Sequence, residues 1–264
     1  MKKAILAVSF GTSYPETLQR TIAATEEMLR KTFPDWEVRR AFTSGMIIRK
    51  LQKRDGLEID TVTQAMKRLE AEGYTHVAVQ STHVMHGEEY EKMLSQLEPF
   101  RLRLRIAVGM PLLHAQEDYE KTAKALLEWL PPVEENEALV LMGHGTEHFA
   151  NSAYAQMEQI LREHSNRVYL ATVEGYPTLD TLLEQLKEQQ YQEVVLVPMM
   201  LVAGDHAQND MAGDEEDSWK SVLTRHGYTV TLQMQGLGAY PAVQALYVAH
   251  VQHMLELSPE GGER

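Results

Sequence analysis

The sequence of 264 residues contains no cysteine. Structural disulfides, iron–sulfur clusters and thiolate-bound zinc are therefore excluded, and any metal that the chain binds must be held by nitrogen and oxygen. Long apolar runs are also missing, since no segment reaches the length of a membrane span. The apolar run of residues 4–8 is too short for the core of a signal peptide. We therefore expect a cytoplasmic protein with no membrane partner.

Positive charge is scarce as well. The chain has 25 Lys and Arg residues against 38 Asp and Glu residues, which gives a net charge of −13. This balance argues against nucleic acid or an anionic lipid surface as a main partner. It is compatible with an anionic small molecule held in a locally basic cleft. With 44% hydrophobic residues, the chain can bury one large core or two modest ones.

Short apolar segments alternate with amphipathic ones along the whole chain, which predicts an α/β fold with parallel strands and right-handed crossovers. The predicted strands are 4–9, 37–42, 76–80, 102–108, 139–142, 167–173, 193–202 and 229–233. The predicted helices are 14–32, 61–72, 116–130, 152–164, 178–189 and 241–257.

The two halves of the sequence resemble each other. FGT at 10–12 aligns with HGT at 144–146, and Val, Ala and Gly at 38, 41 and 45 align with the same residues at 168, 171 and 175. Residues 85–90 align with 202–207. We predict two similar doubly wound domains with a cleft between them, 1–130 and 137–264, joined by the Pro-Pro and acidic segment between them. The last helix could pack on the N-terminal domain instead of its own. Convergence of two unrelated domains is the alternative.

Two histidines follow buried-type strands of the second half. His144 lies between two glycines after the strand at 139–142, and His206 follows the apolar run 194–202. Glu174 follows the strand between them in the chain. Because ligands bind at the carboxyl ends of parallel strands, these residues can converge on a metal site or an acid–base site. Two nitrogens and one oxygen suit a late first-row divalent ion with open positions. Solvated loop residues are the competing interpretation.

The repeat places different groups at the equivalent positions of the first half. Phe10 corresponds to His144, Ser44 to Glu174 and Glu89 to His206. A flat ligand between the halves would thus meet metal ligands on one side and a different wall on the other. The basic stretch Arg49–Arg54 is either a solvated helix face or a receptor for carboxylates. The loop SFGTS at 9–13 matches neither a dinucleotide fingerprint nor a P-loop, so we expect no nucleotide.

Longer motifs resemble those of the anaerobic cobaltochelatases, which are class II chelatases of cobalamin synthesis. They are SFGTS at 9–13, AFTSGMIIRKL at 41–51, MGHG at 142–145 and LVAGDHAQNDMA at 201–212, and the resemblance runs from residue 1 to about 255. It implies a two-domain chelatase fold with a tetrapyrrole, sirohydrochlorin, in the interdomain cleft. It also implies Co²⁺ as the metal substrate, with Fe²⁺ or Ni²⁺ accepted in vitro, and no nucleotide or iron–sulfur cluster. A homo-oligomer is compatible with the pattern.

The resemblance also implies roles for particular residues. It places the metal on His144, Glu174 and His206, and we expect catalysis to depend on His144, His206 and Glu89. The expected contacts with the tetrapyrrole are Phe10, Gly11, Thr12, Ser13, Ser44 and Arg49. Two other functions stay open: an iron chelatase for sirohaem or haem, and a module that binds tetrapyrrole or metal without inserting it.

Overall fold

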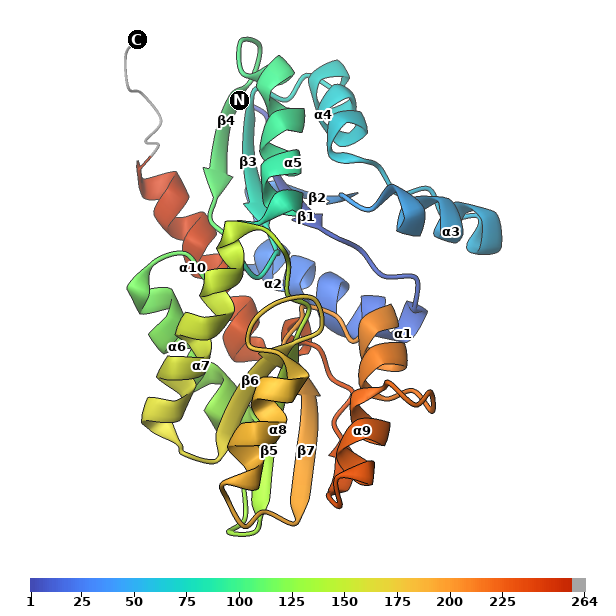
Figure 1. The fold of residues 1–264 in the computed structure, drawn as a ribbon. Helices are drawn as coiled ribbons and strands as arrows, with labels where there is room; N and C mark the ends of the chain where they lie inside the picture. The colour runs from blue at the N-terminus through green and yellow to red at the C-terminus, as the bar shows by residue number, and fades with distance from the viewer. Residues whose placement is uncertain (258–264) are drawn as a thin grey trace. The chain divides into compact units, whose positions relative to one another are not determined.

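The computed structural model describes residues 1–257, and its chain forms two compact units (Figure 1). Unit 1 comprises Met1–His114 together with the last helix, and unit 2 comprises Ala115–Tyr240. The predicted domain boundary at 130–137 therefore lies inside unit 2. The reason is that helix α6 (Gln116–Trp129) packs on helix α7 (Ser152–His164), with the Gln156 side chain donating to Gln116 at 2.8 Å.

Unit 1 is a parallel sheet of four strands in the order β2-β1-β3-β4. Its strands are β1 Lys3–Ser9, β2 Glu37–Phe42, β3 His76–Ser81 and β4 Arg105–Gly109. Its helices are α1 Pro15–Leu18, α2 Ala24–Thr32, α3 Gly45–Asp55, α4 Val62–Ala71, α5 Glu88–Leu97 and α10 Pro241–Leu257, with a π-helical turn η1 Gln19–Ala23 joining α1 to α2 and a 3₁₀ turn η2 Glu98–Phe100.

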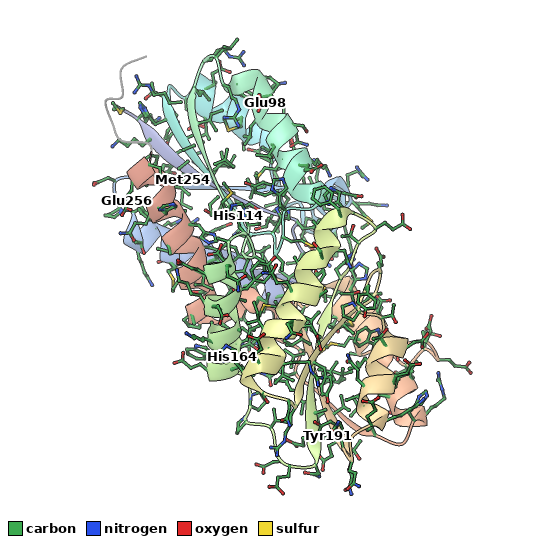
Figure 2. The ribbon with its side chains drawn as sticks, turned by 60° about the vertical axis from the view of Figure 1, so that its left-hand side comes forward. Glu98, His114, His164, Tyr191, Met254 and Glu256 are labelled. Atoms are coloured by element: carbon green, nitrogen blue, oxygen red, sulfur yellow. The ribbon has the colours of Figure 1, made fainter. Side chains whose placement is uncertain are left out.

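Helices cover both faces of this sheet, which explains why β1 is apolar at nearly every position. Successive side chains of a strand point to opposite faces. Leu6 packs in a cluster that contains Met66 of α4 and Met93 of α5. Ile5 packs on the other face, in a cluster that contains Leu29 of α2 and Met254 of α10. Helix α10 lies beside α2, β3 and β4, and Figure 2 labels Met254 on it.

Unit 2 has the same topology, with the parallel order β6-β5-β7-β8. Its strands are β5 Glu137–Gly143, β6 Val168–Thr172, β7 Glu193–Pro198 and β8 Thr229–Leu232. Besides α6 and α7, its helical segments are η3 Phe149–Asn151, α8 Leu179–Lys187, the π-helical turn η4 Ala207–Met211, α9 Trp219–Arg225 and η5 Leu237–Ala239.

The internal repeat predicted from the sequence is visible in this shared topology. The glycines that follow the first strand of each unit, Gly11 and Gly145, both have a left-handed backbone, with φ of 106° and 80°. In each sheet the second strand in sequence lies on one side of the first, and the third strand lies on the other side. The strand order therefore reverses at a switch point between β1 and β3 in unit 1, and at another between β5 and β7 in unit 2. Ligands of doubly wound sheets bind outside the carboxyl ends of the strands at such a point.

The strand predicted over 193–202 is shorter in the structure, where β7 ends at Pro198. Pro198 has no N–H to donate, and the pairing with β5 ends one residue later, where the Met199 N–H donates to the Met142 carbonyl at 2.8 Å. The apolar residues that follow are used differently: the main-chain oxygens of Met200 and Leu201 accept hydrogen bonds from Leu237 and Gly238 at 2.8 and 3.0 Å. His206 thus stands at the start of η4 rather than directly after the strand.

Within residues 1–257, none of the helices combines the length and apolar character that crossing a membrane requires.

Candidate metal centre

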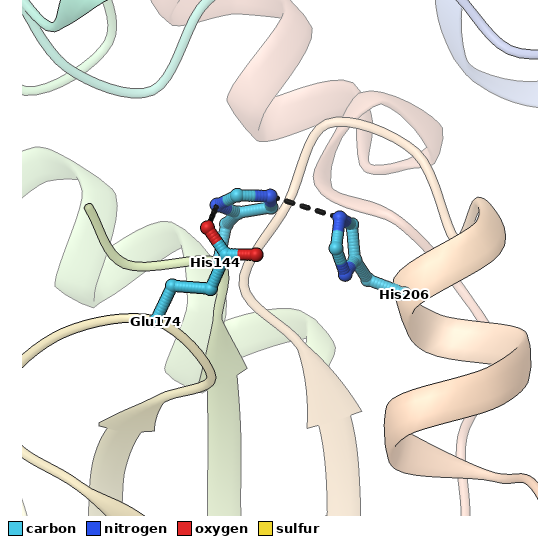
Figure 3. Close-up of side chains that lie close together, drawn as sticks. All are labelled: His144, Glu174 and His206. Atoms are coloured by element: carbon cyan, nitrogen blue, oxygen red, sulfur yellow. Dashed lines mark hydrogen bonds and ion pairs between the residues drawn. The ribbon is translucent and has the colours of Figure 1, made fainter.

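Three side chains meet at the carboxyl end of the unit 2 sheet (Figure 3). His144 directly follows β5, Glu174 follows β6, and His206 precedes the π-helical turn η4. One ligand atom of each lies within 4.8 Å of those of the other two. His144 and His206 lie on the two sides of the switch point, so the fold itself explains why residues distant in sequence converge here.

The two imidazoles face each other through the same kind of nitrogen. Nε2 of His144 lies 2.9 Å from Nε2 of His206, and the rings meet edge to face. The remaining nitrogens contact oxygens that can only accept: the Gly145 carbonyl at 2.8 Å from Nδ1 of His144, and the Asp210 carboxylate at 2.6 Å from Nδ1 of His206. Each Nδ1 must therefore carry the proton. In the neutral rings, both Nε2 atoms then present lone pairs to the same point.

A cation at that point resolves the repulsion between the two lone pairs. Imidazole nitrogens bind late first-row divalent metals at about 2.0–2.1 Å. Two such ligands of one ion are about 2.9 Å apart at a right angle and about 3.3 Å apart at a tetrahedral angle, so the two Nε2 atoms, 2.9 Å apart, lie close to the spacing that a shared ion requires. A single shared proton is the alternative occupant. The pair is thus a candidate for holding a metal ion.

Asp210 holds the ring of His206 from behind. The carboxylate lies four residues further along the helical turn η4, and its Oδ2 accepts from Nδ1 at 2.6 Å. Outer carboxylates of this kind fix the tautomer of a metal-binding histidine and make its other nitrogen more basic. This residue was not predicted from the sequence, although the spacing of four to His206 is a signal that could have found it.

Glu174 contributes the oxygen of the cluster. Its carboxylate lies 3.8 Å from Nδ1 of His144, and 55% of its side chain is exposed. The backbone that carries it is tied to the His144 loop, because the N–H groups of Val173 and Glu174 donate to the carbonyls of Gly143 and His144 at 3.1 and 2.8 Å. The main chain is thus fixed while the carboxylate can reorient toward a metal.

The loop after β5 is closely packed from two sides. A Cβ on Gly145 would lie 2.5 Å from the backbone nitrogen of Gly175, and the left-handed φ also favours glycine at this position. From α7, the ring of Tyr154 occupies the space that a Cβ on Gly143 would need. Burial raises the pKa of Tyr154 to about 12, and backbone hydrogen bonds from Gly145 and His144 oppose this rise. The phenol therefore stays neutral and supports the loop.

The residues predicted to contact a tetrapyrrole lie at the carboxyl end of the unit 1 sheet. Phe10 is 43% exposed, whereas Thr12 and Ser13 are buried. Gly11 packs against the ring of Phe42. Ser44 caps α3, because its hydroxyl accepts from the Ile47 N–H at 3.3 Å. Buried and capping positions of this kind have a structural use whatever they bind.

Arg49 is an exposed residue of α3. The buried residues of this helix are Ile47 and Leu51. Part of the basic stretch has a structural role instead. Arg54 donates to the Ser13 carbonyl at 2.6 Å and pairs with Asp55, also at 2.6 Å. Arg49 thus remains available as a group for carboxylates, while Arg54 ties α3 to the loop after β1.

Glu89, at the start of α5, is paired with a lysine that the sequence did not single out. Nζ of Lys92 lies 3.3 Å from the Glu89 carboxylate and donates to the Thr43 carbonyl at 2.7 Å. Beside them, His83 is held by Ser81, whose hydroxyl lies 2.8 Å from Nδ1. Burial lowers the pKa of His83 to about 4 despite the opposing charge of Glu89.

The chain has relatives among known proteins. The family described as cobalt chelatase (CbiK) matches residues 3–256. A sirohydrochlorin cobaltochelatase of Salmonella typhimurium is 44% identical over 261 residues, which is 98% of this chain and 99% of the relative. The sirohydrochlorin cobaltochelatase CbiKC of Nitratidesulfovibrio vulgaris is 36% identical over 254 residues, 95% of this chain and 89% of the relative.

The fold also has solved counterparts. SirB from Bacillus subtilis with Fe³⁺ superposes with a TM-score of 0.67 at 19% sequence identity, over 98% of this chain and 97% of that one. At this identity the likeness concerns the fold alone, which is the two-unit α/β architecture expected from the sequence. The match to the family model and the two relatives extend over nearly the whole length. The chain belongs to the cobalt chelatase (CbiK) family.

Proposed function

We propose that the chain inserts Co²⁺ into sirohydrochlorin, using His144, His206 and Glu174 to hold the metal before transfer. Family membership and the names of two full-length relatives support the reaction. The observation that carries the assignment of the site is the pair of Nε2 atoms 2.9 Å apart, each with its Nδ1 engaged by an oxygen. We expect no nucleotide requirement, because the loop at 9–13 matches neither a dinucleotide fingerprint nor a P-loop.

The donor set suits a metal that must leave again. Nitrogen and oxygen ligands of intermediate softness bind Co²⁺ without the grip of thiolates. His206, supported by Asp210, and Glu174 retain the ion. His144 releases it first, because its Nδ1 rests on a neutral carbonyl that makes Nε2 a weaker ligand than the carboxylate-supported one.

The released His144 then accepts a pyrrole proton at Nε2. Its ring becomes an imidazolium whose Nδ1–H donates to the Gly145 carbonyl, and once the metal has left, the Glu174 carboxylate at 3.8 Å from Nδ1 stabilises the positive charge. A positioned base of this kind contributes about 10²–10⁴-fold to a rate. Glu89 is the candidate for the second proton. Metallation releases two protons for each Co²⁺ that enters the ring, so the charge of the product balances.

The substrate is an anionic tetrapyrrole. We assign its contacts to the unit 1 residues Phe10, Gly11, Thr12, Ser13, Ser44 and Arg49. Exposed Phe10 offers an apolar surface to the macrocycle, and exposed Arg49 offers a fork of donors to peripheral carboxylates. The protein thus binds the ring through groups that differ in kind from those that hold the metal.

A spectrophotometric assay tests the proposal. The protein is mixed with sirohydrochlorin and Co²⁺, Fe²⁺, Ni²⁺ or Zn²⁺ in turn, and the absorption of the metallated ring is followed. We expect insertion of Co²⁺, and a loss of about 10²–10⁴-fold in H144A and H206A. The control is H226A, an exposed histidine at the end of α9 in the same unit.

Three results would contradict the proposal. Full activity of H144A at limiting Co²⁺ would remove the assigned site. Insertion of Fe²⁺ but not Co²⁺ would make the protein an iron chelatase. Stoichiometric binding of the ring without any spectral change to the metallated form would make it a binding module.

A further inference from the structure

Asn151 has a side chain that links the two loops of the candidate metal centre. The residue ends η3 and precedes α7, a position where asparagine usually caps the helix with its side chain. Here the amide makes no such cap bond. Its Oδ1 accepts from the Thr146 N–H at 3.1 Å, and its Nδ2 donates to the Tyr176 carbonyl at 2.8 Å.

The two partners of this amide belong to the segments that carry metal ligands. Thr146 follows His144 by two residues, and Tyr176 follows Glu174 by two residues. A side chain on Gly175 would collide with the Asn151 amide, and one on Gly145 would collide with the backbone of Gly175. The loops and the amide are therefore closely packed against one another.

Both functions of the amide are needed for this link. Thr146 presents a donor and Tyr176 presents an acceptor, so the bridging group must accept on one side and donate on the other. An ionised aspartate keeps the first contact but sets a carboxylate oxygen against the Tyr176 carbonyl. Alanine removes both contacts. N151D therefore breaks only the contact with the Glu174 loop, whereas N151A breaks the contacts with both loops.

We propose that Asn151 is a positioning residue that fixes Glu174 relative to His144 and thereby sets the affinity of the site for Co²⁺. This inference rests on the proposed function of the His144, Glu174 and His206 site. Its side chain hydrogen-bonds to the backbone of the loops that bear the ligands, and it acts through that backbone. Outer groups that orient ligands change metal affinity by about 10–100-fold when they are mutated.

The test measures Co²⁺ binding by full-length wild-type protein, N151A and N151D, with calorimetry and the visible absorption of bound Co²⁺. The matched control is N136A, which removes another side-chain hydrogen bond of unit 2, from Asn136 to Glu193 at 3.2 Å before β5. We expect Kd for Co²⁺ to rise about 10–100-fold in N151A and N151D and to stay unchanged in N136A. Thermal unfolding separates these effects from loss of stability, and N151D carries the test if N151A does not fold.

A double-mutant cycle with E174Q identifies the route of the effect. If Asn151 acts through Glu174, N151D adds little to the loss already caused by E174Q. Wild-type affinity in folded N151D, an equal loss in N136A, or full additivity with E174Q would each overturn the inference. Failure of the proposed function has a different signature, because wild-type protein itself would then bind no Co²⁺ or would not metallate the ring.

Discussion

Nε2 of His144 lies 2.9 Å from Nε2 of His206, and an accepting oxygen holds the opposite nitrogen of each ring. The two supports differ in charge. Nδ1 of His144 contacts the neutral carbonyl of Gly145, and Nδ1 of His206 contacts the carboxylate of Asp210. The imidazoles are therefore unequal, and under the proposed function this difference sets the order in which they release a shared metal ion.

Replacing Asp210 with Asn should weaken metal binding while leaving His206 in place. The amide oxygen can still accept from Nδ1, but the negative charge that makes Nε2 more basic is lost. We expect about 10–100-fold weaker Co²⁺ binding and a similar loss of insertion rate at limiting Co²⁺. Calorimetry and the chelation assay measure the two quantities. D214N is the control, since exposed Asp214 pairs with Lys220 at 2.6 Å and is not one of the three residues of the candidate metal centre. Equal affinities of D210N and wild type would contradict the role of Asp210.

Replacing Gly145 with Ala should lower the free energy of unfolding more than the same change at another left-handed glycine. At Gly227, with φ of 93°, a Cβ meets nothing within 4 Å, so G227A costs about 1 kcal/mol of backbone strain. At Gly145 the Cβ also meets the backbone of Gly175, which adds about 1–3 kcal/mol of overpacking. Urea denaturation of both variants gives the free energies of unfolding. If the two variants lose equal stability, the close packing of the loops is not important.

Reversing the charge of Arg49 should affect substrate binding more than turnover. R49E removes a donor for substrate carboxylates that is remote from the metal, so KM for sirohydrochlorin should rise while kcat changes little. The assay is the initial rate of metallation at varied sirohydrochlorin. K67E makes the same change on the exposed side of α4 and corrects for the overall charge. An unchanged KM in R49E would exclude Arg49 from the binding surface.

The stability of the protein should fall between about pH 6.5 and pH 4 because of His83. Burial lowers the pKa of this imidazole from 6.5 to about 4, so the folded protein keeps it neutral while the unfolded chain takes up a proton. Stability is therefore complete above about pH 6.5 and decreases as the pH falls, by up to about 3 kcal/mol.

Denaturant unfolding across this pH range checks the effect. H83Q removes the titrating group, so its stability should depend less on pH than that of the wild type. H253Q changes an exposed histidine of α10 and should follow the wild type. Parallel curves for wild type and H83Q would show that His83 is not the source.

Particular features of the sequence predicted much of this structure. Apolar runs bounded by glycine predicted the central strands, because strands covered on both faces are apolar at successive positions. Sheet topology then brought His144, Glu174 and His206 together. The end of β7 and the place of α6 were predicted wrongly. The apolar run continues to Val202 although β7 ends at Pro198, so hydrophobicity alone does not mark the end of the strand. The hydrophobic period of α6 predicts a helix, but it does not say which unit that helix packs on.

Outer contacts of the site were the least predictable part. Asp210 stands four residues from His206, so its spacing carries a signal that could have been used. Asn151 carries none, because its partners are a backbone N–H and a backbone carbonyl of two different loops. A side chain that contacts only main chain leaves no pattern of residue types in the sequence.

The path of the chain has a further consequence. The segment from Ala115 to Tyr240 enters after β4 and leaves before α10, so unit 2 is an uninterrupted insertion into unit 1, and unit 1 is assembled from two separate stretches. His144, Glu174 and His206 all belong to the inserted stretch. Cutting the gene between its two sequence repeats would thus deprive unit 1 of its last helix, whereas excising the insertion would remove all three residues of the candidate metal centre in one piece.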